Sequence, residues 1–105
     1  MAAAALVTLA GGTALQAVDA ASMALQNVIG LVCDPVANRV EVPCLGRNVM
    51  AASNALACAN MALADYAHLI PLDEVIDAMD AARSRACGES GECPSPLPRV
   101  FLRGV

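Results

Sequence analysis

Aromatic side chains are nearly absent from this sequence, which holds one Phe, one Tyr and no Trp. A hydrophobic core must therefore be built from Ala, Leu, Val, Ile and Met. Alanine is the best helix former, and its small side chain lets neighbouring helices pack closely. With 105 residues the chain forms one domain at most. These features predict a single all-α domain.

Glycine and threonine residues mark the boundaries of the first two expected helices. The small-residue run 2–9 is expected to be helical and to stop at Gly11 and Gly12, with Thr13 as the N-cap of the next helix. Gly30 is expected to end that second helix. Its apolar and small residues form one stripe at helical spacing: Leu15, Val18, Ser22, Leu25 and Ile29.

Two further helices are expected in the second half of the chain. The third runs from about residue 48 to residue 64. The fourth begins at Pro71, with the first-turn charges Asp73 and Glu74. Residues 87–105 are rich in turn-forming residues and are expected to form an irregular tail. The prediction is thus about four helices followed by a tail.

Residues 31–46 are the least helical internal section and are predicted to form an ordered loop. Pro35 and Pro43 are incompatible with a helix interior, and Cys33 and Cys44 stand near the two ends. Thiolates are preferred ligands of zinc, copper(I) and iron–sulfur clusters. The eleven-residue spacing fits no generic metal motif, however. On spacing alone, two buried structural thiols are the better interpretation.

Charge and composition exclude several functions. All six basic residues are Arg, and the net charge is −4, so the basic patch that nucleic-acid binding needs is missing. A chain without Lys cannot form the Schiff base of pyridoxal phosphate. The apolar start lacks the features of a signal peptide, and no run is apolar and long enough to cross a membrane. We therefore expect a cytoplasmic protein whose five cysteines are free thiols or metal ligands.

Several runs of residues resemble a known family. They are Gly-Leu-Val-Cys-Asp-Pro-Val-Ala at 30–37, Val-Glu-Val-Pro-Cys at 40–44, Arg-Asn at 47–48, and Ile-Pro-Leu-Asp-Glu-Val-Ile-Asp-Ala-Met at 70–79. Together they are similar to the C-terminal signature of the iron–sulfur-dependent L-serine dehydratases. The resemblance extends from residue 1 to about residue 80.

The resemblance implies a lyase that converts L-serine to pyruvate and ammonia with a [4Fe–4S] cluster rather than pyridoxal phosphate. By analogy, Cys33 and Cys44 are two of the three cysteines that hold the cluster and leave one iron open as a Lewis acid. Residues 1–86 would then be an incomplete cluster-binding segment, because the family's first cluster cysteine and substrate-binding regions lie upstream. The partners implied are L-serine and the remaining part of the enzyme or a beta chain, and a homo-oligomer is left open.

Arg47 and Asn48, directly after the second signature cysteine, are candidates for binding the substrate carboxylate. A structural role at the start of a helix explains them equally well. No catalytic residue is assigned. Cys58 is interpreted as a packing residue, and the single histidine, His68, as a surface or capping residue.

Cys87 and Cys93 could join Cys33 and Cys44 in a four-cysteine site, but exposed, unpaired thiols are the better interpretation. The alternative to an enzyme fragment is a small non-catalytic helical protein. Its cysteines would be structural or would bind metal adventitiously.

Overall fold

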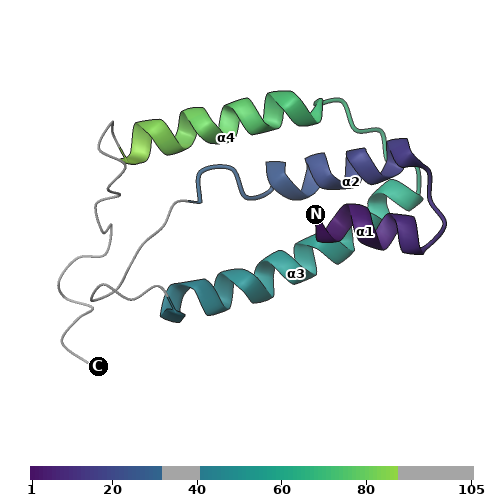
Figure 1. Ribbon diagram of the computed structural model, residues 1–105, viewed down its shortest axis with the longest axis horizontal. Coiled ribbons are helices and arrows are strands. Elements are labelled where there is room, and N and C mark those ends of the chain that lie inside the picture. Colours follow the sequence, from purple (N-terminus) through teal and green to yellow (C-terminus); the bar gives the residue numbers. More distant parts are fainter. Residues whose placement is uncertain (32–40, 88–105) are drawn as a thin grey trace.

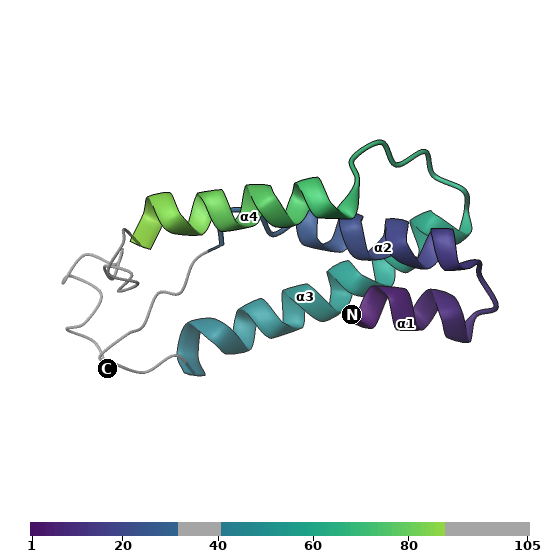
Figure 2. The ribbon, with the colours of Figure 1, turned by 45° about the horizontal axis from the view of Figure 1, so that its top comes forward.

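The computed structural model describes residues 1–31 and 41–87. Within these ranges the chain forms helices and no strand, which confirms the all-α prediction. The helices α1, α2 and α3 pack against one another, whereas α4 packs against α2 alone of the described helices (Figure 1, Figure 2). Their bounds are α1 Ala2–Leu9, α2 Ala14–Gln26, α3 Glu41–Leu63 and α4 Leu72–Cys87.

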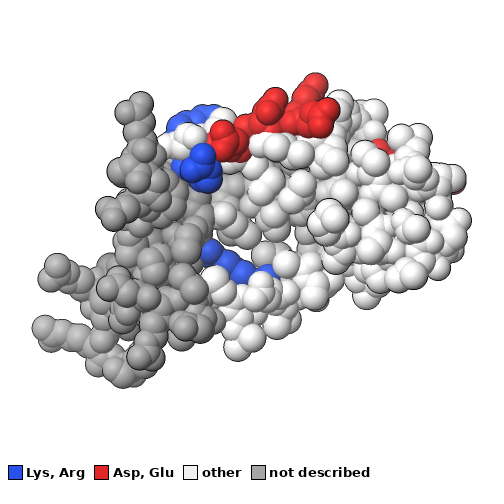
Figure 3. Space-filling model, in the orientation of Figure 1, with Lys and Arg blue, Asp and Glu red and all other residues white. Residues whose placement is uncertain are grey.

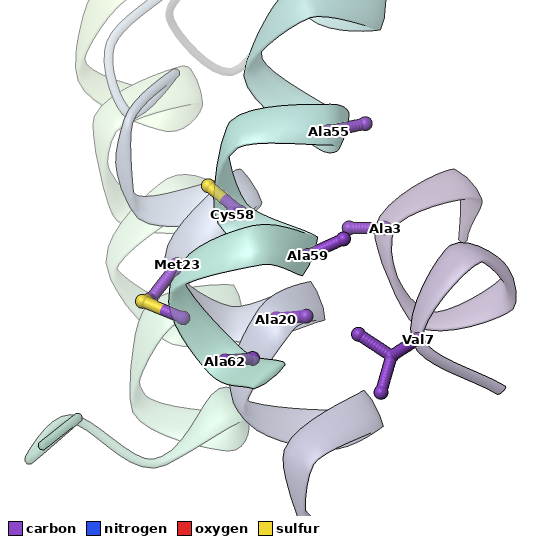
Figure 4. Close-up of a cluster of buried hydrophobic side chains, with 8 residues drawn as sticks. All are labelled: Ala3, Val7, Ala20, Met23, Ala55, Cys58, Ala59 and Ala62. Carbon is purple, nitrogen blue, oxygen red and sulfur yellow. The ribbon is translucent and has the colours of Figure 1, made fainter. Parts of the chain in front are cut away.

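Alanine dominates the core between α1, α2 and α3, as the composition suggests. Small side chains at these positions let the three helices approach closely, with one valine and one methionine filling the remaining space (Figure 4). The buried cluster consists of Ala3, Val7, Ala20, Met23, Ala55, Cys58, Ala59 and Ala62.

The junction between α1 and α2 follows the sequence prediction closely. Gly11 has a φ of +83°, a conformation that favours glycine. Thr13 Oγ1 accepts a hydrogen bond from the Gln16 backbone N–H at 3.2 Å, and Gln16 Oε1 accepts one from the Thr13 N–H at 2.9 Å. This capping box pairs two N–H groups that the helix itself leaves without partners.

Only one residue of the stripe expected along the second helix is buried. Ser22 is 1% exposed, but Leu15 is 71% exposed and Val18 46%. The buried face instead carries Ala20 and Met23 beside Ser22. Four of the five stripe residues have large apolar side chains, whereas close packing in this core favours small ones such as Ala20. α2 also ends at Gln26, before the turn that leads to Gly30.

The predicted boundary between the loop and the third helix is wrong. α3 begins at Glu41, so residues 41–46 are helical and Cys44 lies in the first turns of a helix. Pro43 is the third residue of α3, where the backbone N–H has no partner within the helix, so a proline costs little there. Residues 32–40, with Cys33, lie outside the described residues.

α4 begins one residue after Pro71, whose carbonyl accepts from the Val75 N–H at 3.2 Å. Its first turn carries Asp73 and Glu74, as predicted from the sequence. Val75 is the buried contact of this helix. The acidic side chains of α4 form a surface along one side of the molecule (Figure 3). The tail expected after it lies outside the described residues, except for Cys87 at the end of α4.

Candidate functional site

Three of the four predicted site residues lie on one face of α3. Cys44, Arg47 and Asn48 follow the spacing i, i+3 and i+4, which places side chains together on a helix surface. Cys44 is a half-buried free thiol, Arg47 is half-buried, and Asn48 is exposed. The fourth residue, Cys33, lies outside the described residues.

The chemistry of Cys44 fits a cluster ligand. Its sulfur forms no disulfide and is partly accessible, and soft thiolates are the usual ligands of iron–sulfur clusters. The position also suits an anionic group, because the amino-terminal turn of a helix carries a positive partial charge. Within the described residues, no three His, Cys, Asp or Glu side chains are grouped to hold a metal ion. A cluster held by Cys44 would therefore need its other ligands from outside the described residues.

Cys58 has a different environment. Its side chain is 1% exposed, and burial raises the pKa of its thiol. Asn27 Nδ2 lies 3.5 Å from Cys58 Sγ, which in turn lies 3.5 Å from Asn54 Oδ1. Asn54 also donates to the Ala24 carbonyl at 2.8 Å, so the network joins α2 to α3. A thiol that is buried, protonated and hydrogen-bonded in this way fits the packing role predicted from the sequence.

His68 has a role that the sequence pattern did not predict. The sequence predicts a surface or capping residue, yet His68 is half-buried and its Nε2 lies 2.8 Å from Ser22 Oγ. The Ser22 hydroxyl also contacts the Ile70 carbonyl oxygen at 2.9 Å. The one signal in the sequence was a polar residue, Ser22, within an apolar stripe of α2. The spacing does not predict that Ser22 contacts His68.

The hydrogen bonds around Ser22 indicate which nitrogen of the His68 ring carries a proton. The Ile70 carbonyl can only accept, so the single hydroxyl proton of Ser22 points to it. Ser22 Oγ must then accept from His68, and Nε2 carries the proton. Because Ser22 is buried and its proton is committed to Ile70, this serine–histidine pair is not arranged as a nucleophile and its base.

The segment that contains His68 borders a pocket of about 340 Å³ between α2 and α3. Met23, Cys58 and Met61 supply apolar or sulfur-containing side chains to its lining, and Gln26 and Asn27 supply amides. Of the α3 residues that line the pocket, Cys58 lies nearest to Cys44 along the helix, and Cys44 lies in the first turns of α3. Cys58 comes fourteen positions after Cys44, which corresponds to about 21 Å along the axis of an α-helix. His68 and Cys44 therefore belong to separate regions.

No described helix is long and apolar enough to cross a membrane.

Comparison with known proteins identifies the class of protein to which this helical, cysteine-bearing chain belongs. The family model described as serine dehydratase alpha chain matches residues 1–89. A probable L-serine dehydratase alpha chain of Bacillus subtilis (strain 168) is 61% identical over all of this chain and 37% of its own length. The corresponding protein of Latilactobacillus sakei is 50% identical over all of this chain and 47% of its own length.

A third relative, L-serine dehydratase 1 of Escherichia coli (strain K12), is 45% identical over 75% of this chain and 18% of its own length. The chain belongs to the serine dehydratase alpha chain family. It spans less than half the length of these relatives. The expected position at the C-terminal end of the family's alpha chain stays a prediction.

Proposed function

We propose that this chain is the cluster-binding helical part of an L-serine ammonia-lyase that converts L-serine to pyruvate and ammonia in the cytoplasm. The observation that carries the proposal is the 61% identity to a probable L-serine dehydratase alpha chain over the whole of this chain. The chain spans 37% of that relative, so the proposed activity needs the rest of the alpha chain, and a beta chain where the enzyme has one.

In the proposed enzyme, Cys33 and Cys44 each supply one thiolate to a [4Fe–4S] cluster. When bound, the cluster supplies an open iron that acts as a Lewis acid toward the substrate hydroxyl. The position of Cys44 at the start of α3 supports this role, because the positive partial charge of a helix amino terminus favours bound negative charge.

Arg47 and Asn48 are proposed to bind the carboxylate of L-serine. An arginine side chain can bind a carboxylate through two parallel hydrogen bonds, and an asparagine amide can donate one more. Both residues share the helix face of Cys44, so a carboxylate held there would place the substrate next to the cysteine. Removal of the α-proton needs a base, and none of the described residues is assigned to that role.

A chimera of the Escherichia coli relative tests the proposal. Its 80-residue matching segment is replaced by the corresponding residues of this chain, and the protein is reconstituted anaerobically with iron and sulfide. We expect pyruvate release from L-serine that is lost on exposure to oxygen. The isolated 105-residue chain, treated in the same way, should release none. A folded, iron-loaded chimera without activity would contradict the proposal, as would activity in the isolated chain.

A further inference from the structure

The core-facing line of α3 is covered over only half of its length. Positions 44, 48, 51, 55, 58 and 62 are spaced alternately by four and three residues, so they form one line along the helix. The members from Ala55 onward are buried against α1 and α2. Asn48 and Ala51 are exposed, and Cys44 is half-buried. α3 thus continues beyond the amino-terminal end of α1 (Figure 2).

Beside this line, larger apolar side chains are exposed. Leu45 is 69% exposed, Val49 63% and Leu56 55%. With the exposed Ala52 between them, these residues lie within about 60° of one another on an ideal helix. We call Leu45, Val49, Ala52 and Leu56 the α3 stripe. A continuous apolar stripe of this kind is typical of a surface that another element covers.

The composition of α3 indicates the kind of partner. Its 23 residues include only two charged ones, Glu41 and Arg47, and helices that are apolar on most sides are normally buried. α4 provides a contrast, because its first turns carry the exposed carboxylates Asp73, Glu74 and Asp77 (Figure 3). The α3 stripe is therefore suited to an apolar partner rather than to a charged one.

We propose that the α3 stripe docks an apolar helix from the remainder of the family's alpha chain. The length comparison favours this occupant, because more than half of each of the first two relatives lies outside the matched region. The inference rests on the proposed function only in placing this chain within a longer enzyme. The docked helix would also lie beside Cys44. In the proposed enzyme, this is the side from which the further cluster ligands would come.

Hydrogen exchange of the backbone amides tests the docking. The isolated 105-residue chain is compared with the chimera, and the peptides that span 45–56 are followed. We expect exchange at least about tenfold slower in the chimera, because a covered helix opens less often. Equal exchange rates in the two proteins would overturn the proposal. Slow exchange in the isolated chain that depends on its concentration would also overturn it, since the occupant would then be a second copy.

Two matched substitutions locate the contact. Leu45→Asp alters the stripe, and Leu15→Asp alters a leucine on α2 with nearly the same exposed fraction, 71% against 69%. In the isolated chain both variants should keep the parent melting temperature. In the chimera only Leu45→Asp should lower it by several degrees. Equal losses, or no loss from Leu45→Asp, would contradict docking at α3.

These measurements do not depend on activity, so the two proposals can fail separately. A chimera that is protected at 45–56 but releases no pyruvate would contradict the proposed function and support the docking. An active chimera without protection at 45–56 would support the proposed function and contradict the docking.

Discussion

The imidazole Nε2 of His68 lies 2.8 Å from the buried hydroxyl of Ser22, and this contact fixes the segment between α3 and α4 against α2. The hydroxyl donates a hydrogen bond to the Ile70 carbonyl oxygen at 2.9 Å. Gln16 of α2 donates to Asp65 at 2.8 Å at the start of the same segment. The connection is therefore held at both ends by side chains of one helix.

Removal of the Ser22 hydroxyl should destabilise the protein. Ser22→Ala leaves the Ile70 carbonyl and the His68 N–H without their partner, and we expect a loss of about 1–3 kcal/mol in the free energy of unfolding. Ser53→Ala is the matched control, because Ser53 is exposed and bonds only to the Val49 carbonyl of its own helix. Its effect should stay within about 0.5 kcal/mol. Denaturant unfolding measures both, and equal effects would contradict the assigned role.

The same contact predicts which nitrogen of the neutral His68 ring is protonated. Because His68 is the only histidine, its two ring nitrogens give unambiguous signals in a long-range ¹H–¹⁵N correlation spectrum. We expect Nε2 to carry the proton in the parent chain and a mixture of tautomers in Ser22→Ala. A parent chain protonated mainly on Nδ1 would show that the hydrogen-bond directions around Ser22 are reversed.

Two glycines should respond in opposite ways to alanine. A Cβ atom at Gly12 would lie 2.5 Å from Val7 Cγ1 and 2.9 Å from Leu63 Cδ2, and Val7 is fully buried. Gly12→Ala should therefore destabilise the fold by about 1–3 kcal/mol. At Gly46, inside α3, a Cβ atom would meet nothing within 4 Å. Gly46→Ala should stabilise by about 0.5–1 kcal/mol. Thermal and denaturant unfolding measure both changes in stability. A stabilised Gly12→Ala variant or a destabilised Gly46→Ala variant would contradict the prediction.

Burial of Cys58 predicts a decrease in stability at alkaline pH. The pKa of its thiol is raised above the ordinary value of 9.0 in the folded state. Above that value the unfolded chain loses the proton first, so rising pH favours unfolding, and the full contribution is present only below it. The unfolding free energy should begin to fall near pH 9.0 and continue to fall as the pH rises through the pKa of the folded thiol. In Cys58→Ala the fall should be smaller, and an unchanged pH dependence would contradict the assignment.

The sequence predicts the parts of this fold that local chemistry determines. The Gly11-Gly12 stop and the Thr13 cap depend on φ and on nearby N–H groups, and both are confirmed. The buried face of α2 was missed because it depends on how closely other helices approach, which favoured Ala20 over Leu15. The start of α3 was missed because Pro43 was treated as an interior proline, although it lies in the first turn.

The candidate site shows the same division. The family signature selected Cys44 with Arg47 and Asn48, and the helix places them on one face. The contact of His68 with Ser22 joins residues 46 positions apart, so it depends on the packing of α2 against the connection and not on any local pattern. The roles of Cys33 and Cys44 as ligands stay predictions.

The central claim, that Cys44 is a cluster ligand, is tested most directly by iron content and visible absorption of the reconstituted chimera. Cys44→Ser is compared with Cys58→Ser, because both replace a thiol of α3 and only Cys44 is accessible. The account predicts that Cys44→Ser loses the cluster absorption, the bound iron and pyruvate release, whereas Cys58→Ser keeps all three. A Cys44→Ser chimera that retains its cluster and its activity would contradict the account.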